Sequence, residues 1–194
     1  VPFYNENYKN HGFSIDSFKK FELDQLTELP FLEKEDLRKY CKTSLISSKR
    51  EKYGKFFLSS GSTGTPTSIL FSEAFHQRWS AAFESRIRNW AEIDFKMERG
   101  TIGGRRVVPE GMSNPPYYRY NIFEKQTYFS AYHISKNNAR NYLEGIVKNN
   151  VKYMNGYAMS NYLLCQIFNE LNLEAPTLKA VITSSEKLND NMRK

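Results

Sequence analysis

The last third of the 194-residue chain limits the possible folds most, because two apolar runs of strand length flank a segment with helical periodicity. The runs are Val151–Asn155 and Leu178–Thr183. A strand, a helix and a strand at this spacing form a parallel βαβ unit, which is right-handed in nearly all cases. The pattern therefore predicts the α/β class. The apolar face of the expected helix consists of Leu163, Leu164, Ile167, Phe168 and Leu171.

The middle of the chain contains weaker signals of the same kind. Ser135 is a candidate cap for a further helix, and Gln126–Tyr132 and Arg105–Val108 have strand character. Cys165 lies in an apolar helical run, so we expect it to be buried. The apolar set of the helix after Ser135 repeats at three- and four-residue steps: Ala139, Tyr142, Leu143, Ile146 and Val147.

The first half contains two short apolar runs separated by small residues. Lys55–Leu58 and Ser68–Phe71 read as strands, and the nine residues Ser59–Thr67 join them. We expect these strands to be antiparallel and the joining segment to be exposed and mobile without ligand. Ser72 can then cap a helix to about Ile93. One face of this helix is predicted to be buried, and its members are Phe75, Trp79, Ala82, Phe83, Ile87 and Trp90.

The nine-residue segment Ser59–Thr67 carries the clearest chemistry in the sequence. Its glycines allow close approach of the backbone to a ligand, and successive N–H groups can form an anion-binding nest. Its hydroxyl groups are further donors for phosphate oxygens. It is not a Walker loop, because no Lys follows Gly64. From composition alone, a flexible Ser/Thr/Gly linker remains an equal alternative.

Several segments resemble one protein family. Ser59–Thr67 resembles the signature loop of the adenylate-forming superfamily, and Thr67 stands where the phenylacetate-CoA ligase branch often has Thr. Leu29–Arg38 resembles the LPxxxKxDLR stretch upstream of that loop. Further segments are similar to the CapK-like subgroup, which is named for capsular polysaccharide biosynthesis. These segments are Tyr128–His133, Asn155–Tyr157 and Val181–Leu188.

This resemblance implies a function. Members of the superfamily activate a carboxylate with Mg-ATP to give an acyl-adenylate and pyrophosphate, and a thiol such as that of coenzyme A usually captures the acyl group. The implied cofactors are therefore ATP, magnesium and, in some members, coenzyme A; the implied partners are a small-molecule carboxylate and a nucleotide. The residues that would grip the β- and γ-phosphates are Ser60, Gly61, Ser62, Thr63, Gly64 and Thr65.

The resemblance also implies residues of an acyl and adenine pocket. His133 is the candidate catalytic residue, with a polar strand cap as the alternative. Instead of lining the pocket, Glu186 could face the solvent. Arg105 could attract anions or, equally, form a structural ion pair. The candidate pocket residues are Tyr157, Ser184, Ser185 and Glu186.

By this resemblance, residues 1–194 form part of the larger N-terminal domain, built on a mixed sheet flanked by helices. The magnesium-binding Glu and the C-terminal domain with its catalytic Lys are expected beyond Lys194, where a helix that Asn189 can cap has only begun. We therefore predict no metal ligands within these residues and no turnover by them alone. Apolar faces without a partner would favour self-association.

Composition narrows the other classes of function. The net charge is +7, but the basic residues alternate with acids, and no motif indicates a nucleic-acid partner. The two cysteines have no neighbours at metal spacing. No apolar run is long enough to span a membrane. The two isolated cysteines favour a reduced cytoplasmic protein. Two alternatives to the ligase remain: a non-catalytic nucleotide- or anion-binding module, and a basic nucleic-acid-binding domain with steep salt dependence.

Overall fold

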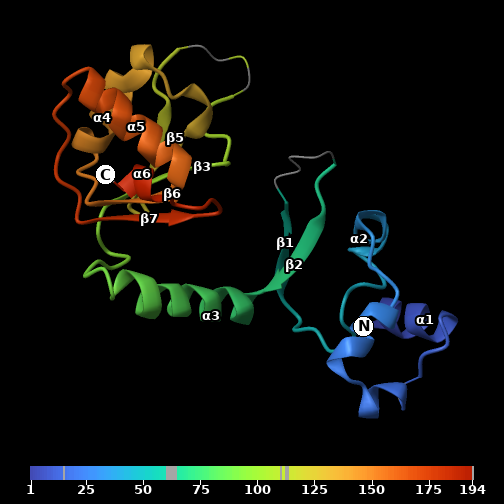
Figure 1. The fold of residues 1–194 in the computed structure, drawn as a ribbon. Coiled ribbons are helices and arrows are strands. Elements are labelled where there is room, and N and C mark those ends of the chain that lie inside the picture. Colours follow the sequence, from blue (N-terminus) through green and yellow to red (C-terminus); the bar gives the residue numbers. More distant parts are fainter. Residues whose placement is uncertain (15, 60–64, 110, 112–113, 194) are drawn as a thin grey trace. The chain divides into compact units, whose positions relative to one another are not determined.

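The chain divides into two units, Val1–Ser80 and Ala81–Lys194. The computed structural model describes residues 1–14, 16–59, 65–109, 111 and 114–193, and its ribbon is drawn in Figure 1. Each unit is described by itself.

The first unit begins with short helices held together by aromatic contacts. The ring of Phe3 on α1 lies 5.3 Å from that of Tyr40 on α2, and the Phe3 N–H donates to Ser44 O. A short charged helix spans Lys34 to Tyr40 as α2. The helical elements here are α1 (Pro2–Asn10), the 3-10 turns η1 (Ser17–Lys20) and η2 (Leu23–Glu28), and α2 (Lys34–Tyr40).

A β-hairpin follows the helices. Strands β1 (Gly54–Leu58) and β2 (Ser68–Ser72) pair antiparallel, with Leu58 opposite Ser68. This confirms the prediction that Ser59–Thr67 joins two antiparallel strands. The hydroxyl of Ser72 accepts the N–H of Phe75 at 3.1 Å, so Ser72 caps the next helix as expected.

Helix α3 (Glu73–Phe83) is shorter than predicted. It passes into a π-helical turn, η3 (Glu84–Arg88), where Arg88 and Glu84 form an ion pair of 2.7 Å. The prediction of a buried face is wrong, since no residue of α3 is buried and Trp79 is 57% exposed. Apolar periodicity predicts a stripe on a helix, but burial also needs an opposing surface, which periodicity does not specify.

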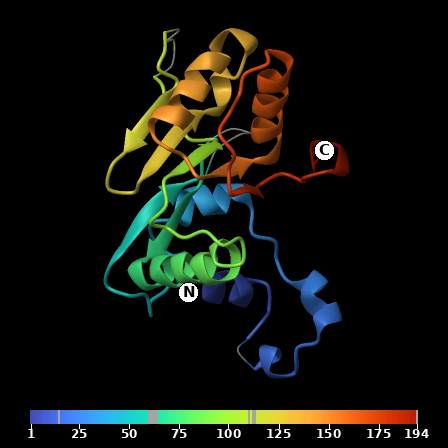
Figure 2. The ribbon, with the colours of Figure 1, turned by 90° about the vertical axis from the view of Figure 1, so that its left-hand side faces the viewer.

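The second unit is built on a five-stranded mixed sheet, which confirms the α/β class. The strand order is β4-β5-β3-β6-β7; β4 is antiparallel to β5, and the other neighbours are parallel. Helices α4 and α5 lie side by side on one face of this sheet (Figures 1 and 2). The strands are β3 (Arg99–Gly103), β4 (Tyr118–Asn121), β5 (Gln126–Ser130), β6 (Tyr153–Tyr157) and β7 (Ala180–Ser184).

The βαβ unit of the last third is confirmed. Strand β6 leads through α5 (Ala158–Glu170) to β7, which pairs parallel with β6. Both strands begin two residues later than predicted. Leu164 and Phe168 of the predicted helix face are buried, whereas Leu163 is exposed. Cys165 is also exposed, against expectation.

The predicted strand at Arg105–Val108 is wrong. The strand there is β3, which ends at Gly103, and residues 104–108 form bends and loop. Strand β3 was missed because Gly100 and Gly103 weaken the pattern. The side chains of Met154 and Phe129 occupy the space where a Cβ of Gly100 would lie. The glycine therefore serves packing.

Two other boundaries differ from the prediction. Strand β5 ends at Ser130 instead of Tyr132, because the 3-10 turn η4 (Ala131–His133) follows at once. Helix α4 (Ala139–Lys148) is preceded by the 3-10 turn η5 (Lys136–Asn138), and Ser135 makes no capping hydrogen bond. In α4 the predicted Ala139, Tyr142 and Ile146 are buried, but Val147 is exposed.

The described chain closes with α6 (Asp190–Arg193). Asn189 Oδ1 accepts the N–H of Met192 at 3.1 Å, which confirms the predicted cap. Across the described residues, no helix combines the length and apolar character needed to cross a bilayer.

Candidate functional site

The base of the candidate phosphate loop is closed by hydrogen bonds between its two legs. Ser59 N–H donates to Thr67 O at 2.9 Å, and Thr67 N–H donates to Ser59 Oγ at 2.9 Å. The Thr67 hydroxyl lies 3.1 Å from the same Oγ. Thr65 is described and exposed. The other predicted phosphate ligands lie outside the described residues: Ser60, Gly61, Ser62, Thr63 and Gly64.

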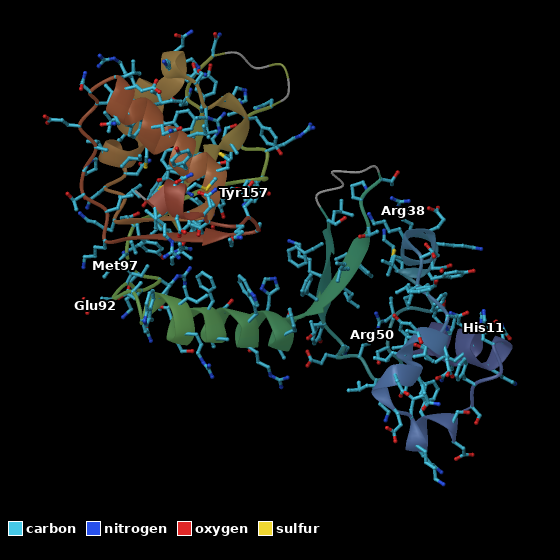
Figure 3. The ribbon with its side chains drawn as sticks, in the orientation of Figure 1. His11, Arg38, Arg50, Glu92, Met97 and Tyr157 are labelled. Carbon is cyan, nitrogen blue, oxygen red and sulfur yellow. The ribbon has the colours of Figure 1, made fainter. Side chains whose placement is uncertain are left out.

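A guanidinium group holds the second leg of the loop. Arg38 of α2 donates from Nε and NH2 to Thr65 O, at 3.1 and 2.9 Å. Its NH1 donates to Glu35 Oε2 at 2.9 Å, one helical turn earlier. Arg38 belongs to the stretch upstream of the loop, but no local sequence signal predicts its contact with Thr65, 27 residues away. Figure 3 labels Arg38 beside the hairpin.

In the second unit, the candidate pocket residues gather at one edge of the sheet. The parallel strands β5, β3, β6 and β7 all end there. Gly103 lies opposite Ser130, and Tyr157 lies opposite Ser184. The carboxyl edge of parallel strands is the usual ligand-binding edge of α/β proteins. The sheet thus brings the ends of β5, β6 and β7 into one row.

His133 lies in η4, immediately after β5. Its Nδ1 is 2.7 Å from Ser130 Oγ, and its ring stacks on Tyr117 with centroids 4.8 Å apart. The Ser130 Oγ already accepts the N–H of Tyr132, so its own proton is available for Nδ1 of His133. This arrangement favours the tautomer with the proton on Nε2, which makes no hydrogen bond to a described residue. His133 can therefore donate a hydrogen bond to an anionic oxygen.

Tyr157 and the neighbours of His133 meet at the end of the central strand. The ring of Tyr157 lies over the Gly103–Gly104 backbone, where its hydroxyl occupies the space of a Gly104 Cβ. Tyr132 donates its hydroxyl to Gly104 O at 3.2 Å. Two tyrosine rings therefore flank this turn, and neither Tyr132 nor Gly104 was predicted as a site residue. Figure 3 labels Tyr157 at this edge.

Ser184, Ser185 and Glu186 follow β7 at the same edge, and all three are exposed. Glu186 has a structural partner: its Oε2 accepts the N–H of Met159 in the first turn of α5 at 2.8 Å. Ser185 has a φ of 68°, which turns the chain toward α5. The geometry assigns Glu186 to capping α5; its exposure agrees with the solvent-facing alternative, and a role in the pocket stays a prediction.

Arg105 stacks on an aromatic ring, and no described residue forms an ion pair with it. Its guanidinium carbon lies 4.4 Å from the centroid of the Tyr128 ring. Burial raises the pKa of the Tyr128 hydroxyl, and the hydrogen bond to Glu124 adds to that rise, while the charges of Arg105 and Arg99 oppose it. Tyr128 therefore stays a neutral donor at the edge of the sheet.

Two cavities of the second unit are lined by residues other than His133. The larger one, about 690 Å³, is lined by α5, β7 and α6 and includes Ala158, Thr183 and Cys165. Neither His133 nor Tyr157 lines it. Within the described ranges, no cluster of three His, Cys, Asp or Glu side chains could hold a metal ion.

Comparison with known proteins relates the chain to a CapK protein. No family model matches the chain. The chain is similar to Protein CapK of Staphylococcus aureus, with 27% identity over 192 residues. The match covers 98% of this chain but only 41% of the length of that protein. The chain thus has a distant CapK relative along almost its whole length.

Proposed function

We propose that this chain is part of an ATP-dependent, carboxylate-activating ligase of the adenylate-forming type. One observation carries the proposal: a loop of the sequence Ser-Ser-Gly-Ser-Thr-Gly-Thr-Pro-Thr closes an antiparallel hairpin, and its legs are held by Ser59, Thr67 and Arg38. Converging N–H and O–H donors on a fixed base are suited to the oxygens of a leaving pyrophosphate.

In the proposed reaction, a carboxylate oxygen attacks the α-phosphorus of ATP, and the bond to the β-phosphate oxygen breaks. Thr65 and the residues before it bind the β- and γ-phosphates. The Nε2–H of His133 donates to the carboxylate or to the acyl-adenylate, and Tyr157 lines the acyl pocket. Ser184 and Ser185 are proposed for the adenine side. The proposed acceptor is coenzyme A or a component of surface-polysaccharide synthesis, as the similarity to CapK suggests.

The test is carboxylate-dependent exchange of labelled pyrophosphate into ATP, performed on the full-length gene product with a panel of carboxylic acids. We expect exchange with at least one acid and its loss in Thr65→Val, which removes a hydroxyl at nearly constant volume. An exposed serine of the same unit, Ser48→Ala, is the matched control. Absence of exchange with every acid would refute the ligase.

The same assay on residues 1–194 addresses what these residues do alone. Each phosphate donor contributes about 0.5–1.5 kcal/mol net, and ordering ATP opposes binding. We therefore expect affinity near the millimolar range at best, and no detectable exchange. Robust exchange by residues 1–194 would show that they hold a complete active site.

A second candidate is a nucleotide- or anion-binding module without catalysis. The observation that favours it is that His133 lines neither of the two cavities described above. It predicts that the full-length gene product binds ATP in a calorimetric titration but exchanges no pyrophosphate with any acid.

A further inference from the structure

We infer that Arg38 is a positioning residue for the polyphosphate: it holds the Thr65 peptide so that the Thr65 N–H and hydroxyl face the bound phosphates. The inference rests on the proposed function and extends it to a side chain outside the loop. Its basis is the pair of hydrogen bonds from the Arg38 guanidinium to Thr65 O, at 3.1 and 2.9 Å.

The carbonyl that Arg38 holds belongs to an unusual peptide group. It precedes Pro66, whose nitrogen has no hydrogen to donate. A residue before proline is also restricted to extended backbone. Arg38 fixes the direction of the Thr65 carbonyl, and Pro66 limits rotation on either side of it. Together they leave the Thr65 N–H and Oγ1 little freedom, and no described residue is hydrogen-bonded to that Oγ1.

The guanidinium is itself held in place. Glu35 binds NH1 at 2.9 Å from one helical turn earlier, and the side chain of Arg38 is only 29% exposed. Helix α2 is tied to the rest of the unit by the Phe3–Tyr40 contact. The planar fork of arginine can give two donors to one acceptor and a third to Glu35, which lysine cannot do. Arg38 therefore transmits a fixed position from α2 to Thr65.

Charge adds to this geometry. The Arg38 cation lies within hydrogen-bond distance of the loop, so it raises the electrostatic potential where phosphates would bind. Glu35 is 79% exposed and offsets that charge only in part, because solvent screens it.

The test compares Arg38→Ala, Arg38→Lys and the control Arg50→Ala in the full-length gene product. Arg50 is an exposed arginine of the same unit, labelled in Figure 3, whose side chain makes no hydrogen bond or ion pair to a described residue. In pyrophosphate exchange, we expect Arg38→Ala to raise KM for ATP about 10- to 100-fold. KM for the carboxylate should stay unchanged, Arg38→Lys should recover little, and added guanidinium ion should restore part of the loss.

Hydrogen exchange of the peptide that contains Ser59 and Thr67 tests the clamp without nucleotide. Their amides are hydrogen-bonded at the base of the loop. We expect faster exchange in Arg38→Ala than in wild type and no change in Arg50→Ala. If Arg38→Ala does not fold, Arg38→Lys provides the same comparison.

The outcomes separate this inference from the proposed function. Unchanged amide exchange in Arg38→Ala would refute the clamp even in an active enzyme. Faster amide exchange with an unchanged KM for ATP would reduce Arg38 to a structural role and overturn the inference. If the wild type neither exchanges pyrophosphate nor binds inorganic pyrophosphate, the proposed function and the positioning role both fail, whereas faster amide exchange would still establish the clamp itself.

Discussion

Glu186 accepts a hydrogen bond from the backbone N–H of Met159 at 2.8 Å, and this contact joins the end of β7 to the first turn of α5. A carboxylate at a helix N-terminus satisfies a free N–H and interacts favourably with the helix dipole. The residue therefore has a stabilising role that the family resemblance did not imply.

Replacing Glu186 by Ala should destabilise the chain by about 0.5–2 kcal/mol, the usual cost of losing a helix cap. Urea unfolding of residues 1–194, followed by circular dichroism, would measure it. Glu174→Ala is the control, because Glu174 is exposed and its side chain makes no hydrogen bond or ion pair to a described residue. Equal stability of the Glu186 and Glu174 variants would show that the cap contributes nothing.

His133→Ala should slow pyrophosphate exchange by the full-length gene product about 100- to 1,000-fold, since it removes a donor aimed at developing charge. Ser130→Ala should cost about tenfold, because it removes only the group that fixes the tautomer. The nitrogen chemical shifts of His133 should report the Nε2–H form in wild type and a mixture in Ser130→Ala. His11→Ala, at an exposed residue, is the control. An unchanged rate in His133→Ala would return this residue to a structural role.

Gly156 should not tolerate a side chain. Its φ is +136°, and a Cβ would collide with the backbone oxygen of Ile102 on the neighbouring strand, which cannot move aside. We expect Gly156→Ala to abolish the cooperative unfolding of the second unit. At Gly100 the obstacle is mainly the flexible end of Met154, so Gly100→Ala should cost about 1–3 kcal/mol. Gly103→Ala meets nothing nearer than 3.9 Å and should be tolerated; folding of all three variants would contradict this order.

The sequence predicted the elements whose signal is local. The βαβ unit and the hairpin follow from apolar runs, small residues and helical periodicity, and both are confirmed. The central strand β3 was missed because Gly100 and Gly103 weaken its pattern, and Gly100 packs against Met154 and Phe129, which lie 29 or more residues away. Burial of the α3 face failed for a related reason, since periodicity does not supply the surface that covers it.

In the candidate site, too, features with a local sequence signal are predictable and long-range contacts are not. The candidate pocket residues of the second unit follow parallel strands. Residues that follow parallel strands lie at the same edge of a sheet, so this grouping is predictable from the strands. The partners of Arg38, Glu186 and Tyr132 lie far away in the sequence, so local sequence signals do not predict these contacts. Arg38 reaches Thr65 across 27 residues, as does Glu186 to Met159. Tyr132 reaches Gly104 across 28 residues.

Tyr142 should make stability fall at alkaline pH. Its ring is buried, and its hydroxyl donates to Ser130 O at 2.7 Å. Burial, with a smaller contribution from Tyr117, raises the pKa of Tyr142 well above the ordinary value of 10.0. Below pH 10 the hydroxyl is protonated in both states, so its stabilising contribution is complete. Above pH 10 the unfolded chain loses this proton first, and the native state is progressively destabilised.

Tyr142→Phe should therefore cost about 1 kcal/mol at pH 8, where it loses the hydrogen bond to Ser130. The difference from wild type should shrink as the pH rises past 10, because phenylalanine has no proton to lose. Urea unfolding at pH 8, 9, 10 and 10.5 would measure both chains. Ile146→Val, a core substitution without a titrating group, should keep a constant difference over the same range. A constant difference for Tyr142→Phe as well would show that this hydroxyl does not link folding to pH.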